Sequence, residues 1–155
     1  MERPTDTGAV TVRAAAPAAT DVTRLVTAME QEMAQRWGND DSGPSLVHDA
    51  RFLVAELDGR AVGCVAVQPL PGGIGELKRM YVAPEVRGRG VGRRLLHAAE
   101  HLAGELGFAA LRLETGTRQP EAVALYERSG WTRITPYGYW RDSPESICFE
   151  KHLSS

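Results

Sequence analysis

Cysteine is scarce in this sequence of 155 residues, which contains only Cys64 and Cys148. Both lie in apolar, strand-like runs, which favours two buried thiols over a disulfide framework. A chain of this length buries roughly 70% of the surface that its unfolded form exposes, so it needs no disulfide for stability. The length also favours one domain over residues 1–155, with a loose polar tail at residues 1–9.

Long apolar runs and a strong excess of charge are also missing. No run approaches the ~20 residues that a membrane-spanning helix needs, and the N-terminus lacks the pattern of a secretory signal. The formal net charge of -2 gives no overall attraction to nucleic acids or acidic membranes. We therefore expect a cytoplasmic protein that binds neither nucleic acid nor membrane, so any anion site must be local.

The pattern of apolar residues and turn signals indicates an α+β chain in which strands outnumber helices. The strongest local signal is Asp58-Gly59 between two apolar runs, because Asp-Gly favours the tight turn of a β-hairpin. Helices are expected at residues 14–37, with Asp21 as a candidate cap, and at residues 90–106 and 120–128. Strands are expected at residues 10–13, 52–57, 60–67, 75–82, 110–114, 131–134 and 147–151.

The strand expected at residues 75–82 has an irregular apolar pattern. Leu77 and Met80 are an odd number of positions apart, so strict alternation would place them on opposite faces of a sheet. One extra residue near Lys78-Arg79, a β-bulge, would return both side chains to one face. A strand buried on both faces explains the pattern equally well, so the sequence leaves both interpretations open.

A loop rich in glycine and arginine, Arg87-Gly88-Arg89-Gly90-Val91-Gly92, follows this strand and opens a helix. Glycine lets a ligand approach the backbone, and a helix N-terminus presents free N–H groups and a positive dipole. The loop therefore predicts a site for a diphosphate. The phosphate loop of NTPases is excluded because no lysine and hydroxyl residue follow the last glycine. The spacing Gly-x-Gly-x-Gly and the preceding hairpin disfavour the dinucleotide fingerprint.

These residues and a later segment resemble the GNAT superfamily of N-acetyltransferases. Arg87, Gly90 and Gly92 fit its coenzyme A motif, Gln/Arg-x-x-Gly-x-Gly/Ala, and Val82-Ala83-Pro84 fits the strand end that precedes it. Residues 119–131, QPEAVALYERSGW, are similar to the family pattern Asn-x-x-Ala-x-x-Leu-Tyr-Glu-x-x-Gly-Phe. Gln119 stands where the family often has asparagine, and the first 50 residues carry little of the resemblance.

The resemblance implies the acyl-CoA N-acyltransferase fold, which is a mixed, mostly antiparallel sheet of about six to seven strands flanked by helices. It implies acetyl-CoA as co-substrate and direct attack by the primary amine of a small or amino-acid-like molecule. Contacts to coenzyme A are then expected from the strand end, the loop and the start of the later helix. The residues concerned are Met80, Tyr81, Val82, Arg87, Gly88, Arg89, Gly90, Val91, Gly92, Arg93 and Gln119.

The resemblance also implies catalytic side chains. Tyr126 is the family's candidate for the acid that assists the leaving thiolate. Glu76 stands where some members carry a catalytic glutamate, and it is the first candidate for the base that takes the amine proton. Glu114 is a weaker candidate for this base. A backbone N–H between Met80 and Val82 would stabilise the carbonyl oxygen, and a bulge would free such groups.

Other features have competing interpretations. The acceptor pocket is expected to draw on residues 38–45 and 137–142, whose aromatic side chains serve either cation–π contacts or packing. Residues 97–101, HAAEH, match a zinc-protease pattern, but a solvated helix face explains them better, so no metal is expected. A catalytically inactive coenzyme A-binding regulator and a protein N-terminal or lysine acetyltransferase are the alternative functions. A homodimer is left open.

Overall fold

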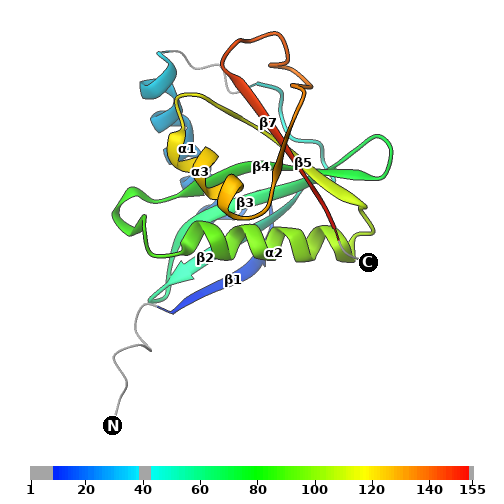
Figure 1. The fold of residues 1–155 in the computed structure, drawn as a ribbon. Helices are drawn as coiled ribbons and strands as arrows, with labels where there is room; N and C mark the ends of the chain where they lie inside the picture. Colours follow the sequence, from blue (N-terminus) through cyan, green and yellow to red (C-terminus); the bar gives the residue numbers. More distant parts are fainter. Residues whose placement is uncertain (1–8, 39–42, 154–155) are drawn as a thin grey trace.

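Seven strands form one sheet in the computed structural model, which describes residues 9–38 and 43–153. The strand order is β1-β2-β3-β4-β5-β7-β6, and all neighbouring pairs are antiparallel except β4 and β5 (Figure 1). The strands are β1 (Val10–Ala15), β2 (Arg51–Leu57), β3 (Arg60–Leu70), β4 (Ile74–Val82), β5 (Ala110–Gly116), β6 (Thr132–Ile134) and β7 (Ser146–His152). The expected α+β fold with a mostly antiparallel sheet is confirmed.

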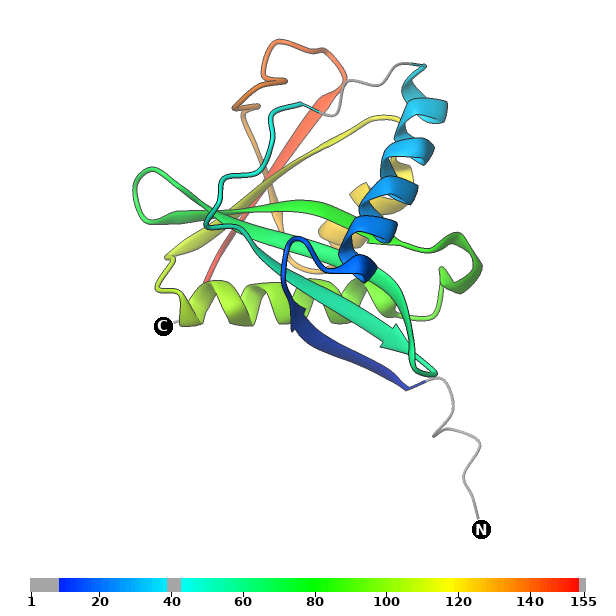
Figure 2. The ribbon, with the colours of Figure 1, turned by 180° about the vertical axis from the view of Figure 1, so that it is seen from behind.

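In the described part of the chain, three α-helices cover the two faces of the sheet. Helix α1 (Thr20–Trp37) lies on one face, whereas α2 (Val91–Glu105) and α3 (Pro120–Arg128) lie on the other (Figures 1 and 2). A short 3-10 helix, η2 (Pro84–Val86), leads from β4 towards α2. No helix among the described residues has the length and apolar character that crossing a bilayer requires.

The hydrophobic core follows from the alternation of side chains along the strands. On β2, Phe52 and Val54 pack in a cluster with Leu25 of α1, while Leu53 and Ala55 belong to the cluster that contains Leu95 of α2. Strands β2 and β3 are therefore buried on both faces, which explains their nearly continuous apolar sequences.

The start of the first helix differs from the prediction. β1 continues to Ala15, which pairs with Phe52 of β2, and α1 begins only at Thr20. Pro17 lies between them, and a proline disfavours helical backbone at the residue before it. Asp21 does not cap the helix, since the N-cap is Ala19. Asp21 lies in the first turn, where its negative charge favours the helix dipole.

The irregular strand β4 contains the predicted bulge. Cys64 of β3 pairs with Tyr81, whereas Ala66 pairs with Lys78, so two residues of β4 oppose one of β3. Arg79 takes a left-handed φ of 58° at this point. Leu77, Met80 and Val82 consequently share the core on the α2 side, although the residue count alone would separate the first two. The bulge is the correct one of the two interpretations.

Strands β4 and β5 separate soon after they meet. Their parallel pairing covers only Ile74–Glu76 against Ala110–Arg112. β4 then continues to Val82 and β5 to Gly116 without further pairing between them. The separation leaves the facing edges of two central strands without strand partners, and the candidate site lies at this gap.

Candidate active site

A cavity of about 740 Å³ occupies the gap between β4 and β5. Leu77 and Lys78 of β4 both line it, as do Leu113 and Glu114 of β5. Because neighbouring residues on a strand point to opposite faces, the cavity passes through the plane of the sheet. Its walls outside the sheet come from residues 27–37 of α1, from Ala122 and Tyr126 of α3, and from the segment 140–146. One ligand can therefore approach from each face and meet the other in the gap.

Tyr126 lines this cavity from the α3 side of the sheet. Its ring packs against Trp131 and Phe149, with centroid distances of 5.9 and 5.8 Å, and only 3% of the residue is exposed. Within residues 9–38 and 43–153 the hydroxyl has no hydrogen-bond partner. Burial raises the pKa of Tyr126, so the phenol stays protonated at neutral pH. The arrangement provides a fixed neutral donor that faces the cavity.

Glu114 lines the cavity from the opposite face. Its carboxylate accepts a hydrogen bond of 3.1 Å from the Ser146 hydroxyl. Burial raises the pKa of Glu114 to about 7, and repulsion by Glu76 acts in the same direction, whereas Ser146 and Lys78 partly oppose the shift. A carboxylate with this pKa exchanges a proton at neutral pH, which suits a general base.

Glu76, the first candidate for the base, has different surroundings. It is 8% exposed, and both of its carboxylate oxygens accept hydrogen bonds. The donors are Gln68 Nε2 at 3.0 Å and the Tyr137 hydroxyl at 2.8 Å. Glu76 is not among the residues that line the cavity. Its visible contacts join β3, β4 and the loop that contains Tyr137, which is a positioning arrangement.

The glycine–arginine loop has the geometry of an anion site. Gly88 and Gly90 have φ values of 82° and 83°, a region that favours glycine. The N–H of Arg94 makes the first bond of α2, to the Gly90 carbonyl at 3.1 Å. In the described part of the chain, no acceptor is found for the N–H groups of Val91, Gly92 and Arg93. Such groups at a helix N-terminus attract phosphate.

Gly92 serves the packing of α2 against α3. A Cβ atom at Gly92 would lie 3.3 Å from Leu125 Cδ2, so a larger residue would require the Leu125 side chain to shift by a few tenths of an ångström. Gly92 thus has a structural reason to be glycine in addition to the ligand contact that the motif implies.

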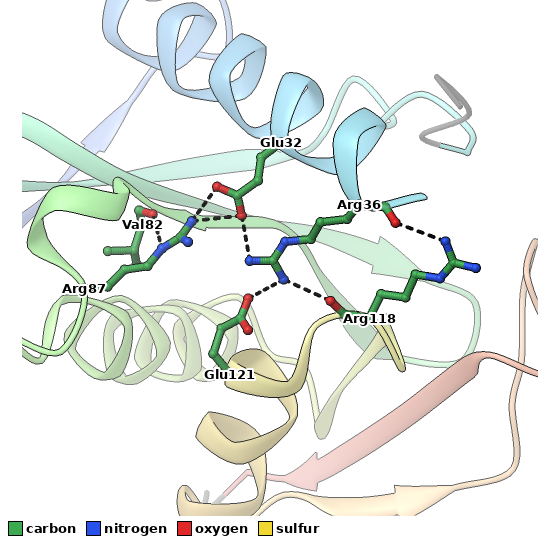
Figure 3. A network of polar contacts seen from close by, with 6 residues as sticks. All are labelled: Glu32, Arg36, Val82, Arg87, Arg118 and Glu121. Atoms are coloured by element: carbon green, nitrogen blue, oxygen red, sulfur yellow. Dashed lines mark hydrogen bonds and ion pairs between the residues drawn. The ribbon is translucent and has the colours of Figure 1, made fainter. Parts of the chain in front are cut away.

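Arg87 is already paired within the protein, which the sequence did not indicate. Its guanidinium forms an ion pair with Glu32 of α1, at 2.8 and 3.0 Å, and donates to the Val82 carbonyl at 3.0 Å. Glu32 also pairs with Arg36 at 3.1 Å. Arg36 in turn contacts Glu121 of α3 (Figure 3). This network joins α1, the strand end and α3 beside the cavity.

The other predicted cofactor residues lie in three environments. Met80 and Gln119 line the cavity, and the Gln119 carbonyl accepts the first hydrogen bonds of α3 from Ala122 and Val123. Tyr81 is 8% exposed and packs in the core on the α1 side, away from the cavity lining. The remaining predicted positions lie outside the cavity lining. They are Val82, Arg87, Gly88, Arg89, Gly90, Val91, Gly92 and Arg93.

The two segments predicted to form the acceptor pocket lie together. A Cβ atom on Gly43 would lie 3.2 Å from Trp140 Nε1, so the segments are in contact, although residues 39–42 lie outside the described part. Trp140 and Trp37 both line the cavity. The Arg118 guanidinium lies 4.8 Å from the centre of the Trp37 ring. Sequence reasoning identified the aromatic loop but missed Trp37 and Arg118, because they come from distant segments.

The zinc-protease pattern does not assemble in space. Glu100 accepts hydrogen bonds from Trp131 Nε1 at 3.1 Å and Lys151 Nζ at 3.0 Å. His97 and His101 are exposed, and His101 contacts Glu105. Among the residues that the structure describes, no group of three or more histidine, cysteine or acidic side chains is placed to hold a metal ion.

Comparison with known proteins agrees with this geometry. Residues 22–131 match the model of the acetyltransferase (GNAT) family. The chain belongs to this family. It is 45% identical over 106 residues to IAA acetyltransferase of Azospirillum brasilense, covering 68% of this chain and 69% of that protein. The chain spans about half to two thirds of the length of several other curated relatives that it matches.

Solved structures have the same fold. An acyl-CoA N-acyltransferase from Klebsiella pneumoniae shares 32% identity and a TM-score of 0.80, over 94% of this chain and 98% of that one. A GNAT acetyltransferase of Elizabethkingia anophelis, solved with acetyl-CoA bound, has a TM-score of 0.69 and 16% identity, over 93% and 98% of the two chains. At that identity the likeness concerns the fold alone. The expected GNAT fold and acetyltransferase class are confirmed.

Proposed function

We propose that this GNAT enzyme transfers the acetyl group of acetyl-CoA to the primary amine of a small or amino-acid-like molecule by direct attack. The observation that carries the proposal is the cavity through the sheet, with Tyr126 on one face and Glu114 on the other. A thioester entering from the α3 face and an amine entering from the α1 face would meet in the gap.

The cofactor side of the proposal rests on the start of α2. The N–H groups of Val91, Gly92 and Arg93 are available to the diphosphate of coenzyme A. Arg89 and Arg93 are exposed and add positive charge. Met80 and Gln119 line the cavity together with Tyr126. The acetyl-CoA complex of the Elizabethkingia relative supports this use of the fold.

The proposed reaction needs one proton transfer and one hydrogen bond to the leaving group. The amine nitrogen forms a bond to the acetyl carbon, the carbon–sulfur bond breaks, and the amine proton passes to the Glu114 carboxylate. The Tyr126 hydroxyl hydrogen-bonds the leaving thiolate. Deprotonating a lysine-type amine at pH 7 costs about 4.6 kcal/mol, against about 1.4 kcal/mol for an α-amine. A base whose pKa is about 7 is therefore of most use with an alkyl amine.

The geometry favours Glu114 over Glu76 as the base. Glu114 lines the cavity and accepts one hydrogen bond, from Ser146. Glu76 lies outside the lining, and two donors occupy its oxygens. We assign Glu76 the role of a positioning residue that holds the Tyr137 loop against the sheet.

Release of free thiol from acetyl-CoA across a panel of amines tests the proposal. The panel should hold alkyl amines and amino acids. IAA should be assayed beside the panel as a separate candidate acceptor, because a relative is named for it. We expect turnover with at least one amine, a strong loss in Glu114→Gln and a smaller loss in Glu76→Gln. Coenzyme A binding without thiol release from any amine would favour the regulator instead.

A further inference from the structure

The Thr115 side chain has an unusual environment for a hydroxyl group. Thr115 lies near the end of β5, is 6% exposed and lines the cavity. In the described part of the chain, its Oγ1 atom is buried and has no hydrogen-bond partner. Buried polar groups are nearly always paired, and an unpaired one destabilises the fold, so this hydroxyl calls for an explanation.

The position of Thr115 on β5 indicates which face of the sheet its side chain occupies. Alternation along β5 places its side chain on the same face as Leu113, which packs in the core with Tyr126. Glu114, between them in sequence, points to the other face. On this stretch β5 pairs with β7 through Thr115 and Ile147, but it has no pairing with β4. Thr115 therefore faces the gap from the side that also holds the Tyr126 hydroxyl.

We infer that Thr115 is a binding residue for the acyl-pantetheine arm of the co-substrate and donates a hydrogen bond to one of its carbonyl oxygens. The inference rests on the proposed function. The arm carries amide carbonyls and the thioester carbonyl, all of which are acceptors, and it would enter on the Tyr126 side. The acceptor amine would approach on the Glu114 side. The hydroxyl thus gains its partner only when the co-substrate binds.

Two opposite effects of one substitution test this role. Thr115→Val keeps the shape of the side chain and removes the hydroxyl. Calorimetric titration should show affinity for acetyl-CoA reduced about tenfold. The melting temperature of the ligand-free protein should rise by roughly 2–4 °C, because an unpaired buried hydroxyl is removed. If Thr115 had a purely structural role, Thr115→Val would not combine a rise in melting temperature with a loss of acetyl-CoA affinity.

Two control variants complete the experiment. Thr115→Ser retains the hydroxyl and should keep acetyl-CoA affinity within about threefold of the wild type. Thr132→Val makes the same chemical change at an exposed position of β6 and should alter neither quantity. Titration with free coenzyme A locates the partner. A loss for both ligands indicates an amide carbonyl, and a loss for acetyl-CoA alone indicates the thioester carbonyl.

The possible failures can be told apart. If the wild type binds acetyl-CoA and Thr115→Val binds it equally well, this inference is wrong and the proposed function stands. A lower melting temperature in Thr115→Val would mean that the hydroxyl is satisfied inside the protein, which also overturns the inference. A wild-type protein that binds neither ligand would overturn the proposed function, and this inference with it.

Discussion

The raised pKa of Glu114 predicts that the ionised Glu114 carboxylate destabilises the folded protein. The pKa rises from 4.5 to about 7, mainly because burial disfavours the charged carboxylate. At about 1.4 kcal/mol per unit, the ionised group costs the fold about 3 kcal/mol relative to an exposed glutamate. Glu114→Gln keeps the side-chain shape and removes the charge, so it should recover most of this free energy.

The sign of the pH dependence follows from proton linkage. Between pH 4.5 and about 7 the folded protein holds the Glu114 proton that the unfolded chain has already released. Stability from this group is therefore fully present below pH 4.5, falls as the pH rises, and is lost above about pH 7. Glu114→Gln should match the wild type at low pH and exceed its free energy of unfolding by about 3 kcal/mol at high pH.

Urea unfolding at several pH values measures this difference. Glu127→Gln is a matched control, because the Glu127 side chain is 53% exposed and its ion pair with Arg133 spans 3.6 Å. It should change the free energy of unfolding by less than about 1 kcal/mol at any pH. The same variant Glu114→Gln should lose roughly 10²-fold in turnover. The reasoning would be refuted if Glu114→Gln were no more stable than the wild type, or if its gain in stability were equal at all pH values.

Three further predictions concern other groups. Tyr126→Phe should lower kcat roughly 10²-fold without lowering the melting temperature, because the hydroxyl has no partner in the described part of the chain; unchanged turnover would exclude Tyr126 from catalysis. Glu32→Gln should release Arg87 and lower the KM for acetyl-CoA about threefold at low salt, an effect that fades at high salt; a higher KM in steady-state assays would contradict this. Cys64 should resist alkylation in the native protein at about pH 8, as read by mass spectrometry, because burial raises its pKa to about 12; rapid labelling would argue against such burial.

The features predictable from sequence are those fixed by neighbouring residues. The Asp58-Gly59 turn is confirmed, since both residues have positive φ, 54° and 76°, as one of the two tight hairpin turns requires. The bulge at Arg79 was indicated by the odd spacing of Leu77 and Met80. The glycines at positions 88 and 90 indicated the anion loop, and the structure adds that both have positive φ. Each of these signals is contained within a few residues.

The features that sequence could not predict depend on contacts between distant segments. The ion pair between Glu32 and Arg87 joins residues 55 positions apart, and neither the helix nor the loop indicates the other. The Thr115 hydroxyl is unpaired because β4 and β5 diverge, and that divergence is a property of the whole sheet. The wrong start for α1 has the same origin, since the pairing of β1 with β2 extends the strand.

The proposed choice between two glutamates rests on tertiary structure. Glu76 and Glu114 lie on neighbouring strands and point to the same face, so either could be a base by local pattern alone. Tyr137, 61 positions from Glu76, donates to that carboxylate. A carboxylate that already accepts two hydrogen bonds would have to exchange a partner before it could take a proton. The gap between β4 and β5 leaves Glu114 at the cavity, where burial raises its pKa to about 7, so the carboxyl group still titrates near neutral pH. In the proposed reaction, the same separation of strands would admit the ligands and raise the pKa of the base.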